Sequence, residues 1–231
     1  MLLYIIRHGE PGVDGALTEL GLKQAEAVGE RLCKSKIDKI YSSPFLRARQ
    51  TAEPLCRMLG KEMIIEEWAH EIGKERITTF PDGKEISVSL LQTTIFRTEK
   101  NINLPFERAF EADGFRESGM EGAVRYIEEN GDKFLERLGY KKENGVYRIL
   151  RNNEERVALF CHSAFSRAWI SRLLHIPIHI MWASFDYAHS GVTVIEFENN
   201  ADGFTAPICH CYSDLSHLYK NNVPIEKRCE L

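Results

Sequence analysis

Residues 2–10 read LLYIIRHGE, an apolar run that stops abruptly at an arginine, a histidine and a glycine. Apolar runs of β-branched and aromatic residues are typical of strands buried within a parallel sheet. In open α/β sheets, ligands bind outside the carboxyl ends of such strands. The stretch therefore predicts a buried strand that carries Arg7 and His8 to a ligand site. Taken alone, it fits a surface turn with two incidental basic residues equally well.

The chain beyond this strand alternates between helical and extended patterns. Apolar residues at helical spacing predict helices over residues 18–34, 44–59, 120–138 and 163–174. Short apolar runs predict strands over residues 37–41, 63–65, 156–161, 192–197 and 204–212. Thr18 is a suitable N-cap for the first helix, and Ser43 followed by Pro44 suits the start of the second. The alternation predicts an α/β fold, a three-layer sandwich whose mainly parallel central sheet is flanked by helices.

Periodicity is lost between residues 72 and 119, where glycine, proline, asparagine and charged residues alternate with short apolar groups. The helix at 120–138 follows, and then a hairpin over residues 140–149 that turns at Asn144-Gly145, a strong hairpin signal. We interpret residues 72–150 as an inserted cap, called the cap insert below. It belongs to a single predicted domain that spans residues 1–231.

The composition of the chain limits the classes of partner. Its 231 residues are 43% hydrophobic, with a formal net charge of −4 and a pI near 6.1. This balance gives no overall attraction to nucleic acid or to an anionic membrane. No run reaches the ~18 apolar residues of a membrane span, and no targeting signal precedes the first strand, so we expect a cytoplasmic protein. The sequence allows a homodimer.

The six cysteines are scattered along the chain, and we expect free thiols. The cluster Cys209-His210-Cys211 could suggest a metal. In the predicted strand, however, side-chain alternation sends the two sulfurs to one face and the imidazole to the other. No second pair stands at zinc-binding spacing. We therefore expect neither a metal nor a cofactor.

Four basic residues fall at equivalent places in the predicted fold. Arg7 and His8 end the first strand, Arg47 lies in the first turn of the second helix, and His162 ends the strand at 156–161. In a parallel sheet these strand ends share one edge, so the four side chains can converge. Arginines suit bidentate contacts to phosphate, a helix N-terminus such as that at Ser163 adds backbone N–H donors, and a histidine can attack phosphorus. The pattern predicts a phosphoryl-binding site.

Several sequence blocks in a fixed order make this interpretation more specific. They are RHGE at 7–10, LTxxGxxQA at 17–25, SSPxxRAxxTA at 42–52 and the strand-end His162. Together they resemble the histidine phosphatase superfamily, also called the phosphoglycerate mutase-like family, over roughly residues 1–71 and 155–197. The resemblance implies the phosphoglycerate mutase-like fold. It also implies a metal-independent phosphomonoester hydrolase of the histidine acid phosphatase type, acting on a small phosphorylated metabolite.

The resemblance also assigns roles to the four basic residues. The histidine that matches His8 is phosphorylated during the reaction. The residues that match Arg7, Arg47 and His162 hold the phosphoryl group. An acidic residue after the third strand protonates the leaving oxygen.

Three carboxylates follow the third strand, namely Glu66, Glu67 and Glu71. We favour Glu71 as the acid because residues 68–72 resemble a variant of the superfamily pattern, in which an aromatic residue precedes the acid by three positions. Glu67 is the next choice. Four later histidines show no partner in the sequence and are interpreted as structural: His175, His179, His189 and His217.

The chain departs from the family pattern in two places. The family has glycine after its second histidine, where this chain has Ser163, which narrows the pocket, adds a hydroxyl donor or caps the helix. Mutase-like members carry an asparagine in a longer loop after the first histidine, whereas residues 10–17 are short and contain none. The short loop favours hydrolysis. The alternatives are a phosphoglycerate-type mutase and a phospho-ligand binding protein with little turnover.

Overall fold

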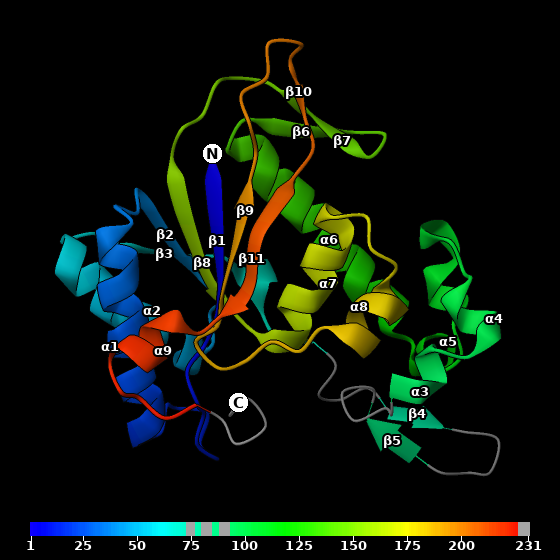
Figure 1. The fold of residues 1–231 in the computed structure, drawn as a ribbon, viewed down its shortest axis with the longest axis horizontal. Helices are drawn as coiled ribbons and strands as arrows, with labels where there is room; N and C mark the ends of the chain where they lie inside the picture. Colours follow the sequence, from blue (N-terminus) through cyan, green and yellow to red (C-terminus); the bar gives the residue numbers. More distant parts are fainter. Residues whose placement is uncertain (73–76, 80–84, 88–92, 226–231) are drawn as a thin grey trace.

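The computed structural model describes residues 1–72, 77–79, 85–87 and 93–225. Its main sheet has six strands in the order β11-β9-β1-β8-β2-β3 (Figure 1). Neighbours among β1, β8, β2 and β3 are parallel, whereas β9 is antiparallel to both β1 and β11, so the mainly parallel sheet is confirmed. The strands are β1 (Leu2–Arg7), β2 (Lys39–Ser42), β3 (Met63–Ile65), β8 (Arg156–Cys161), β9 (Val192–Glu196) and β11 (Ile208–Asp214).

Helices cover both faces of this sheet and give the three predicted layers (Figure 1). Alternate residues of β1 divide between the two faces. Tyr4 and Ile6 pack in the core with α1 and α2, whereas Leu3 and Ile5 pack in the core with α6 and α7. Burial on both faces explains why β1 is a continuous apolar run. The long helices are α1 (Glu19–Lys34), α2 (Leu46–Leu59), α6 (Met120–Arg137) and α7 (Ser163–Leu173), and the short α9 (Ser216–Lys220) packs on α1.

The N-terminal ends of the first two helices differ in how well the sequence predicts them. Thr18 caps α1 as predicted, because its side-chain oxygen accepts from the backbone N–H of Gly21 at 3.0 Å. The second helix begins at Leu46, after an N-cap at Phe45, and not at Pro44. The Ser43 hydroxyl, expected to cap this helix, accepts from the N–H of Phe45 at 3.3 Å and also lies 2.7 Å from a ring nitrogen of His162. The serine thus joins the start of the helix to a distant histidine, while the N-cap position itself falls on Phe45.

The predicted strand over residues 204–212 is wrong, because the structure divides it in two. Phe204–Thr205 forms β10, which pairs with β7 (Val146–Ile149), whereas β11 pairs with β9. Pro207 lies between the two pieces and has no N–H to donate to a sheet. The hairpin of β6 (Tyr140–Glu143) and β7 is confirmed, and both of its turn residues have the positive φ of a type I′ turn.

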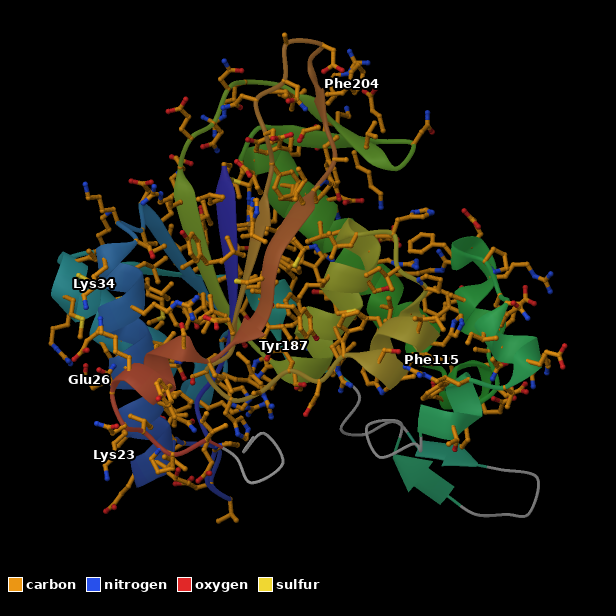
Figure 2. The ribbon with its side chains drawn as sticks, in the orientation of Figure 1. Lys23, Glu26, Lys34, Phe115, Tyr187 and Phe204 are labelled. Carbon is orange, nitrogen blue, oxygen red and sulfur yellow. The ribbon has the colours of Figure 1, made fainter. Side chains whose placement is uncertain are left out.

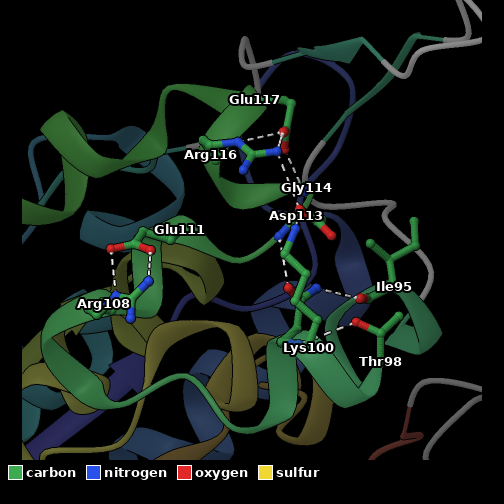
Figure 3. A network of polar contacts seen from close by, with 10 residues as sticks. Ile95, Thr98, Lys100, Arg108, Glu111, Asp113, Gly114, Arg116 and Glu117 are labelled. Carbon is green, nitrogen blue, oxygen red and sulfur yellow. Dashed lines mark hydrogen bonds and ion pairs between the residues drawn. The ribbon is translucent and has the colours of Figure 1, made fainter.

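The described part of the cap insert consists of short elements held to the core by a few aromatic rings. Phe96, Phe110 and Phe115 are buried and join the apolar core that also contains α6 and α7. Charged pairs lie on the outside, among them Lys100 with Asp113 (Figure 3). Exposed pairs of this kind contribute about 0–1 kcal/mol each. Residues 73–76, 80–84 and 88–92 of the insert lie outside the described residues. Before α6, the elements are β4 (Ile77–Thr79), β5 (Glu85–Ser87), α3 (Thr93–Phe96), α4 (Glu99–Ile102), η3 (Phe106–Glu111) and α5 (Phe115–Ser118).

Two further segments complete the described chain. The 3-10 turn η1 (Glu67–Ala69) follows β3, and the helix α8 (Ile178–Ser184) follows α7. Over the residues that the structure describes, no helix is both long enough and apolar enough to cross a membrane. The cysteines at positions 33, 56, 161, 209 and 211 are free thiols.

Candidate active site

The turn after β1 is fixed by a close approach of two backbone segments. A Cβ atom on Gly9 would lie 2.6 Å from the carbonyl oxygen of Gly21, and one on Gly21 would lie 2.2 Å from that of Glu10. Neither position can therefore take a side chain without moving the backbone. The Gln24 side chain accepts from the N–H of Glu10 at 2.8 Å. These contacts hold His8 against the start of α1.

His8 is oriented so that one ring nitrogen is available for chemistry. Its Nδ1 atom lies 2.7 Å from the carbonyl oxygen of Gly9, which can only accept, so Nδ1 carries the proton. The lone pair of Nε2 then accepts from Nε–H of Arg47 at 3.0 Å. Burial, reinforced by His162 and Arg7, holds the pKa of His8 well below its ordinary value. The ring is therefore neutral at pH 7 and can act as a nucleophile.

Arg7 lies on the other side of His8 and meets a histidine that the sequence did not indicate. Its guanidinium donates to the carbonyl oxygen of Tyr187 and to Nε2 of His189, the latter at 2.7 Å. Tyr187 lies near the carboxyl ends of the strands (Figure 2). The rings of His8 and His189 are 5.6 Å apart. The interpretation of His189 as a residue without a partner is therefore wrong.

The sequence did not indicate His189 as a site residue because no recognisable motif surrounds it. It lies in the loop before β9, and only the antiparallel pairing of β9 with β1 brings that loop to the site. A backbone hydrogen bond from Ser190 to the carbonyl oxygen of His8, 3.1 Å long, fixes the loop there. A basic residue shortly before a strand that borders β1 was the available signal.

His162 completes the group of basic residues at this edge. It is fully buried at the N-cap of α7, with its ring 5.1 Å from that of His8. The hydroxyl of Ser43 lies 2.7 Å from its Nε2 atom and restrains the ring. Ser163 is the first residue of α7 and is half-buried, so the cap position falls on His162 and not on the serine.

Arg47 projects from the first turn of α2 into the same space. The residue is 8% exposed, and its guanidinium carbon lies 5.0 Å from the centroid of the Phe45 ring. Burial lowers the pKa of Arg47, while the nearby carboxylate of Glu71 opposes this shift. Arginine remains charged throughout the physiological range. Arg47, Glu71 and His8 thus face a common region.

The Glu71 carboxylate lies at the N-terminus of α7. One oxygen accepts from the backbone N–H groups of Ile72 and Phe165, both at 3.0 Å, and the other from Ala164 at 3.4 Å. Both oxygens act as acceptors, as in an ionised carboxylate. A carboxylate at a helix N-terminus is favoured by the free N–H groups and by the helix dipole.

The other two carboxylates considered as the acid lie elsewhere. Glu66 is buried and accepts from the indole N–H of Trp68 at 2.7 Å and from Arg137 at 2.5 Å. These contacts join β3 to α6 and give Glu66 a structural role. Glu67 is exposed to solvent in η1. Of the three, Glu71 is the one whose carboxylate approaches Arg47 and α7.

The cationic groups that converge on the site suit an anion. Two guanidinium groups and two buried imidazoles converge on it, from Arg7, Arg47, His8 and His162. Over the described residues, no group of three or more His, Cys, Asp or Glu side chains is arranged to hold a metal ion. At the Cys209-His210-Cys211 cluster, the His210 imidazole lies 2.6 Å from the Glu196 carboxylate and is engaged there.

Comparisons with known proteins agree with this arrangement. A putative phosphoserine phosphatase 2 of Hydrogenobacter thermophilus is 38% identical over 80 residues, 30% of this chain and 39% of that protein. The fructose-2,6-bisphosphatase TIGAR of Xenopus tropicalis is 37% identical over 76 residues, 28% of this chain and 26% of that protein. The aligned part thus spans well under half of these curated relatives.

Solved structures show the same fold over nearly the whole chain. The phosphoserine phosphatase of Entamoeba histolytica, crystallised with 3-phosphoglyceric acid, superimposes with a TM-score of 0.61 at 22% identity, covering 94% of this chain and 98% of that one. The model of the histidine phosphatase superfamily (branch 1) matches residues 3–206. The predicted family is confirmed, and the chain belongs to the histidine phosphatase superfamily.

Proposed function

We propose that the chain is a metal-independent phosphomonoester hydrolase that acts through a phosphohistidine on His8, with a small phosphorylated metabolite as substrate. The observation that carries the proposal is the orientation of His8. Its Nδ1 proton is held by the Gly9 carbonyl, and its Nε2 lone pair meets the N–H of Arg47. A neutral imidazole that presents a lone pair beside a fixed cation is suited to attack a phosphoryl group.

In the first step, a phosphate ester occupies the space between the two arginines. Nε2 of His8 forms a bond to phosphorus, and the bond from phosphorus to the ester oxygen breaks. Arg7 and Arg47 stabilise the equatorial oxygens as charge spreads over them. His162 lies beside His8 and contributes a further donor when its ring is protonated toward the phosphoryl group. The leaving alkoxide takes a proton from the Glu71 carboxyl group.

In the second step, water attacks the phosphorus of the phosphohistidine. The ionised Glu71 accepts a proton from that water, the bond from phosphorus to Nε2 breaks, and inorganic phosphate leaves. Glu71 thus gives one proton and regains one in each cycle, so the acid and base roles alternate. Its acceptor geometry at the N-terminus of α7 matches the form needed in this second step.

Hydrolysis is preferred over mutase chemistry for a structural reason. A mutase must keep water from its phosphoenzyme, and the short stretch between His8 and α1 provides little cover. Glu10 is occupied within that stretch, because its carboxylate accepts from the Thr18 hydroxyl at 2.8 Å. The substrates of the relatives carry carboxylate or second phosphate groups by name, which supports a small anionic metabolite as the substrate class here.

The experiment that tests this proposal measures phosphate release and the covalent intermediate together. In the presence of a chelator, the chain should release inorganic phosphate from nitrophenyl phosphate. Quenching in alkali, where phosphohistidine is stable, should trap labelled phosphate on a peptide that contains His8. Transfer between acceptors without release would favour the mutase, and binding without either event would favour a phospho-ligand binding protein.

A further inference from the structure

A second cavity lies at the end of α7 that is remote from the catalytic residues. Its volume is about 320 Å³, and its walls come from η3, α6, the β6–β7 hairpin and the last turn of α7. Ser163 and Arg172 stand at opposite ends of this helix, about 14 Å apart at 1.5 Å of rise per residue. The volume lies at the small end of the range for ligand sites. The cavity is therefore separate from the phosphoryl site.

Arg172 lines this cavity with an unusual arrangement of its guanidinium group. Its side chain is 6% exposed, and one terminal nitrogen, Nη1, lies 3.7 Å from the Glu128 carboxylate. Among the described residues, neither Nε nor the other terminal nitrogen, Nη2, has a hydrogen-bond partner. These two atoms form one edge of the guanidinium, the edge that binds a carboxylate through two parallel hydrogen bonds. A buried donor without a partner costs about 1–3 kcal/mol, more when it is charged.

The faces of the guanidinium, in contrast to this edge, are covered by aromatic rings. Its central carbon lies 3.8 Å from the centroid of Phe106 and 5.4 Å from that of Phe110. The half-buried Phe106 ring also stacks on His175, with centroids 3.7 Å apart. Because Nε and Nη2 are buried, a side chain of the cavity wall must move before a ligand can reach this edge. The Phe106 ring then offers an apolar surface to the ligand.

The charge of the lining limits the ligand to a single negative charge. Arg125, Lys142 and Arg172 line the cavity together with the carboxylates of Glu107 and Glu128. Beyond the lining, Glu121 pairs with Arg125 and Asp132 lies 3.5 Å from Lys142, so Arg172 is the lining cation whose charge is least compensated. Glu128 is also shared with Lys142, whose ammonium lies 2.6 Å from it, so it does not fully neutralise Arg172. A monoanion balances this site, whereas a doubly charged phosphate would face the two carboxylates.

We propose that this cavity is a second ligand site, which binds a small aromatic carboxylate. The carboxylate takes the Nε and Nη2 edge of Arg172, and the aromatic ring packs against Phe106 and Phe110. The ligand thereby supplies acceptors to the buried guanidinium edge of Arg172, and its apolar part leaves water at the same time.

Titration of the full chain with 2-naphthoate tests the proposal, with inorganic phosphate present at saturation to fill the catalytic site. We expect one molecule of naphthoate to bind per chain, measured by calorimetry. Arg172→Met should weaken binding roughly tenfold to a hundredfold, the range for a charge-assisted hydrogen bond. Phe106→Ala should weaken it severalfold, and this variant decides the matter if Arg172→Met does not fold.

Two controls make the result specific. Arg108→Gln should leave naphthoate binding unchanged, because Arg108 lies in the same segment η3 but points outward to Glu111 (Figure 3). The uncharged 2-naphthamide should bind at least tenfold more weakly than naphthoate, because it lacks the charge that Arg172 recognises. Absence of naphthoate binding at millimolar concentration would overturn the proposal. So would naphthoate binding that occurs only when phosphate is left out, or full affinity in the Arg172→Met and Phe106→Ala variants.

Discussion

Arg47 and Arg172 are both buried beside a phenylalanine ring, yet they differ in what completes their hydrogen bonding. Arg47 lies 5.0 Å from the centre of the Phe45 ring and donates to Nε2 of His8 at 3.0 Å. Arg172 lies 3.8 Å from the centre of the Phe106 ring, and in the described structure one edge of its guanidinium meets no acceptor. Both clusters thus pair an arginine with a phenylalanine. They differ in whether the guanidinium edge that contains Nε has a hydrogen-bond acceptor.

The difference follows from the part of the fold that supplies the partners. At the first cluster, the ends of parallel strands set the positions of several side chains through the backbone, so donors and acceptors meet. At the second, side chains from packed helices and a hairpin enclose a cavity in which the Glu128 carboxylate approaches only one terminal nitrogen of Arg172. Sheet geometry can therefore preorganise a reaction, whereas helix packing around a buried charge leaves a position for a ligand.

The largest expected effect is that of His8→Ala. The variant should retain less than about 1% of wild-type activity, because it removes the atom that accepts the phosphoryl group. Alkaline quenching should also find no trapped phosphate. His210→Ala is a matched control. That histidine is exposed on the edge strand β11, and its ring contacts the Glu196 carboxylate. Substantial activity in His8→Ala would reject the phosphohistidine mechanism.

Next in size is the effect of Arg47→Lys, which tests whether the first cluster depends on guanidinium geometry. Lysine keeps the charge but lacks the planar fork that stabilises phosphoryl oxygens. Loss of one preorganised donor typically costs 10²–10³ in rate, so we expect kcat/KM to fall by about that factor. Arg108→Lys serves as the control on an exposed pair. A near-wild-type rate in Arg47→Lys would place Arg47 outside the reacting region.

Glu71→Gln should have an effect that depends on the leaving group. An alkoxide needs a proton to leave, so turnover of an alkyl phosphate should fall by about 10², the lower end for general acid catalysis. Nitrophenolate leaves without help, so nitrophenyl phosphate should be affected far less. The alkyl-ester rate should also lose its fall-off at high pH. Equal effects on both esters would assign Glu71 to binding, and a selective effect of Glu67→Gln would move the role there.

A smaller effect is expected from pH, through the lowered pKa of His8. The unfolded chain protonates this histidine near pH 6.5, whereas the folded chain does so only at a lower pH. The unfolded state thus binds more protons between these two values, and the contribution of His8 to folding stability, complete above pH 6.5, is lost as pH falls toward the folded pKa. Denaturant unfolding at several pH values should show this slope, and His8→Gln should flatten it. The plot of kcat/KM against pH should fall on its acid side only below pH 6.5, where His8 becomes protonated.

The smallest effect is expected for the free energy of unfolding of Arg172→Met, measured without added naphthoate. Removing one partner of a buried ion pair is costly when the other charge is left uncompensated, but Glu128 keeps Lys142 as a partner at 2.6 Å, and the apolar methionine avoids the cost of burying a charge. We expect the free energy of unfolding to be unchanged or to rise by about 1 kcal/mol, measured with urea. A loss of more than about 2 kcal/mol would show that Arg172 is a structural residue and would remove the contrast with Arg47.

The cluster of Arg7, His8, Arg47 and His162 was largely predictable because the backbone determines it. Arg7, His8 and His162 sit at the ends of strands whose apolar runs are unambiguous, and Arg47 follows a strand end within one helical turn. Parallel pairing then brings them to one edge without any need to know side-chain rotamers. The prediction of the sheet, its layers and the family succeeded for the same reason.

The parts that were missed depend on tertiary contacts. Ser43 looked like a helix cap, because a local capping bond and a hydrogen bond to a distant histidine have the same sequence signature. His189 is placed by β9, which the periodicity located but could not pair. The division of residues 204–212 into two strands depends on which neighbour each half meets. The cavity around Arg172 is set by packing between segments that carry no motif.

The position of β1 in the middle of the sheet has a consequence for synthesis on the ribosome. Its neighbours are β8 and β9, which begin at Arg156 and Val192. β1 is therefore synthesised before both of its neighbours, and about 150 residues separate it from the nearer one. Because pairings of long sequence separation form slowly, the nascent chain exposes this strand while it is incomplete. The loop that carries His189 reaches His8 only after β9 has paired with β1, so the contact between Ser190 and His8 forms late in folding.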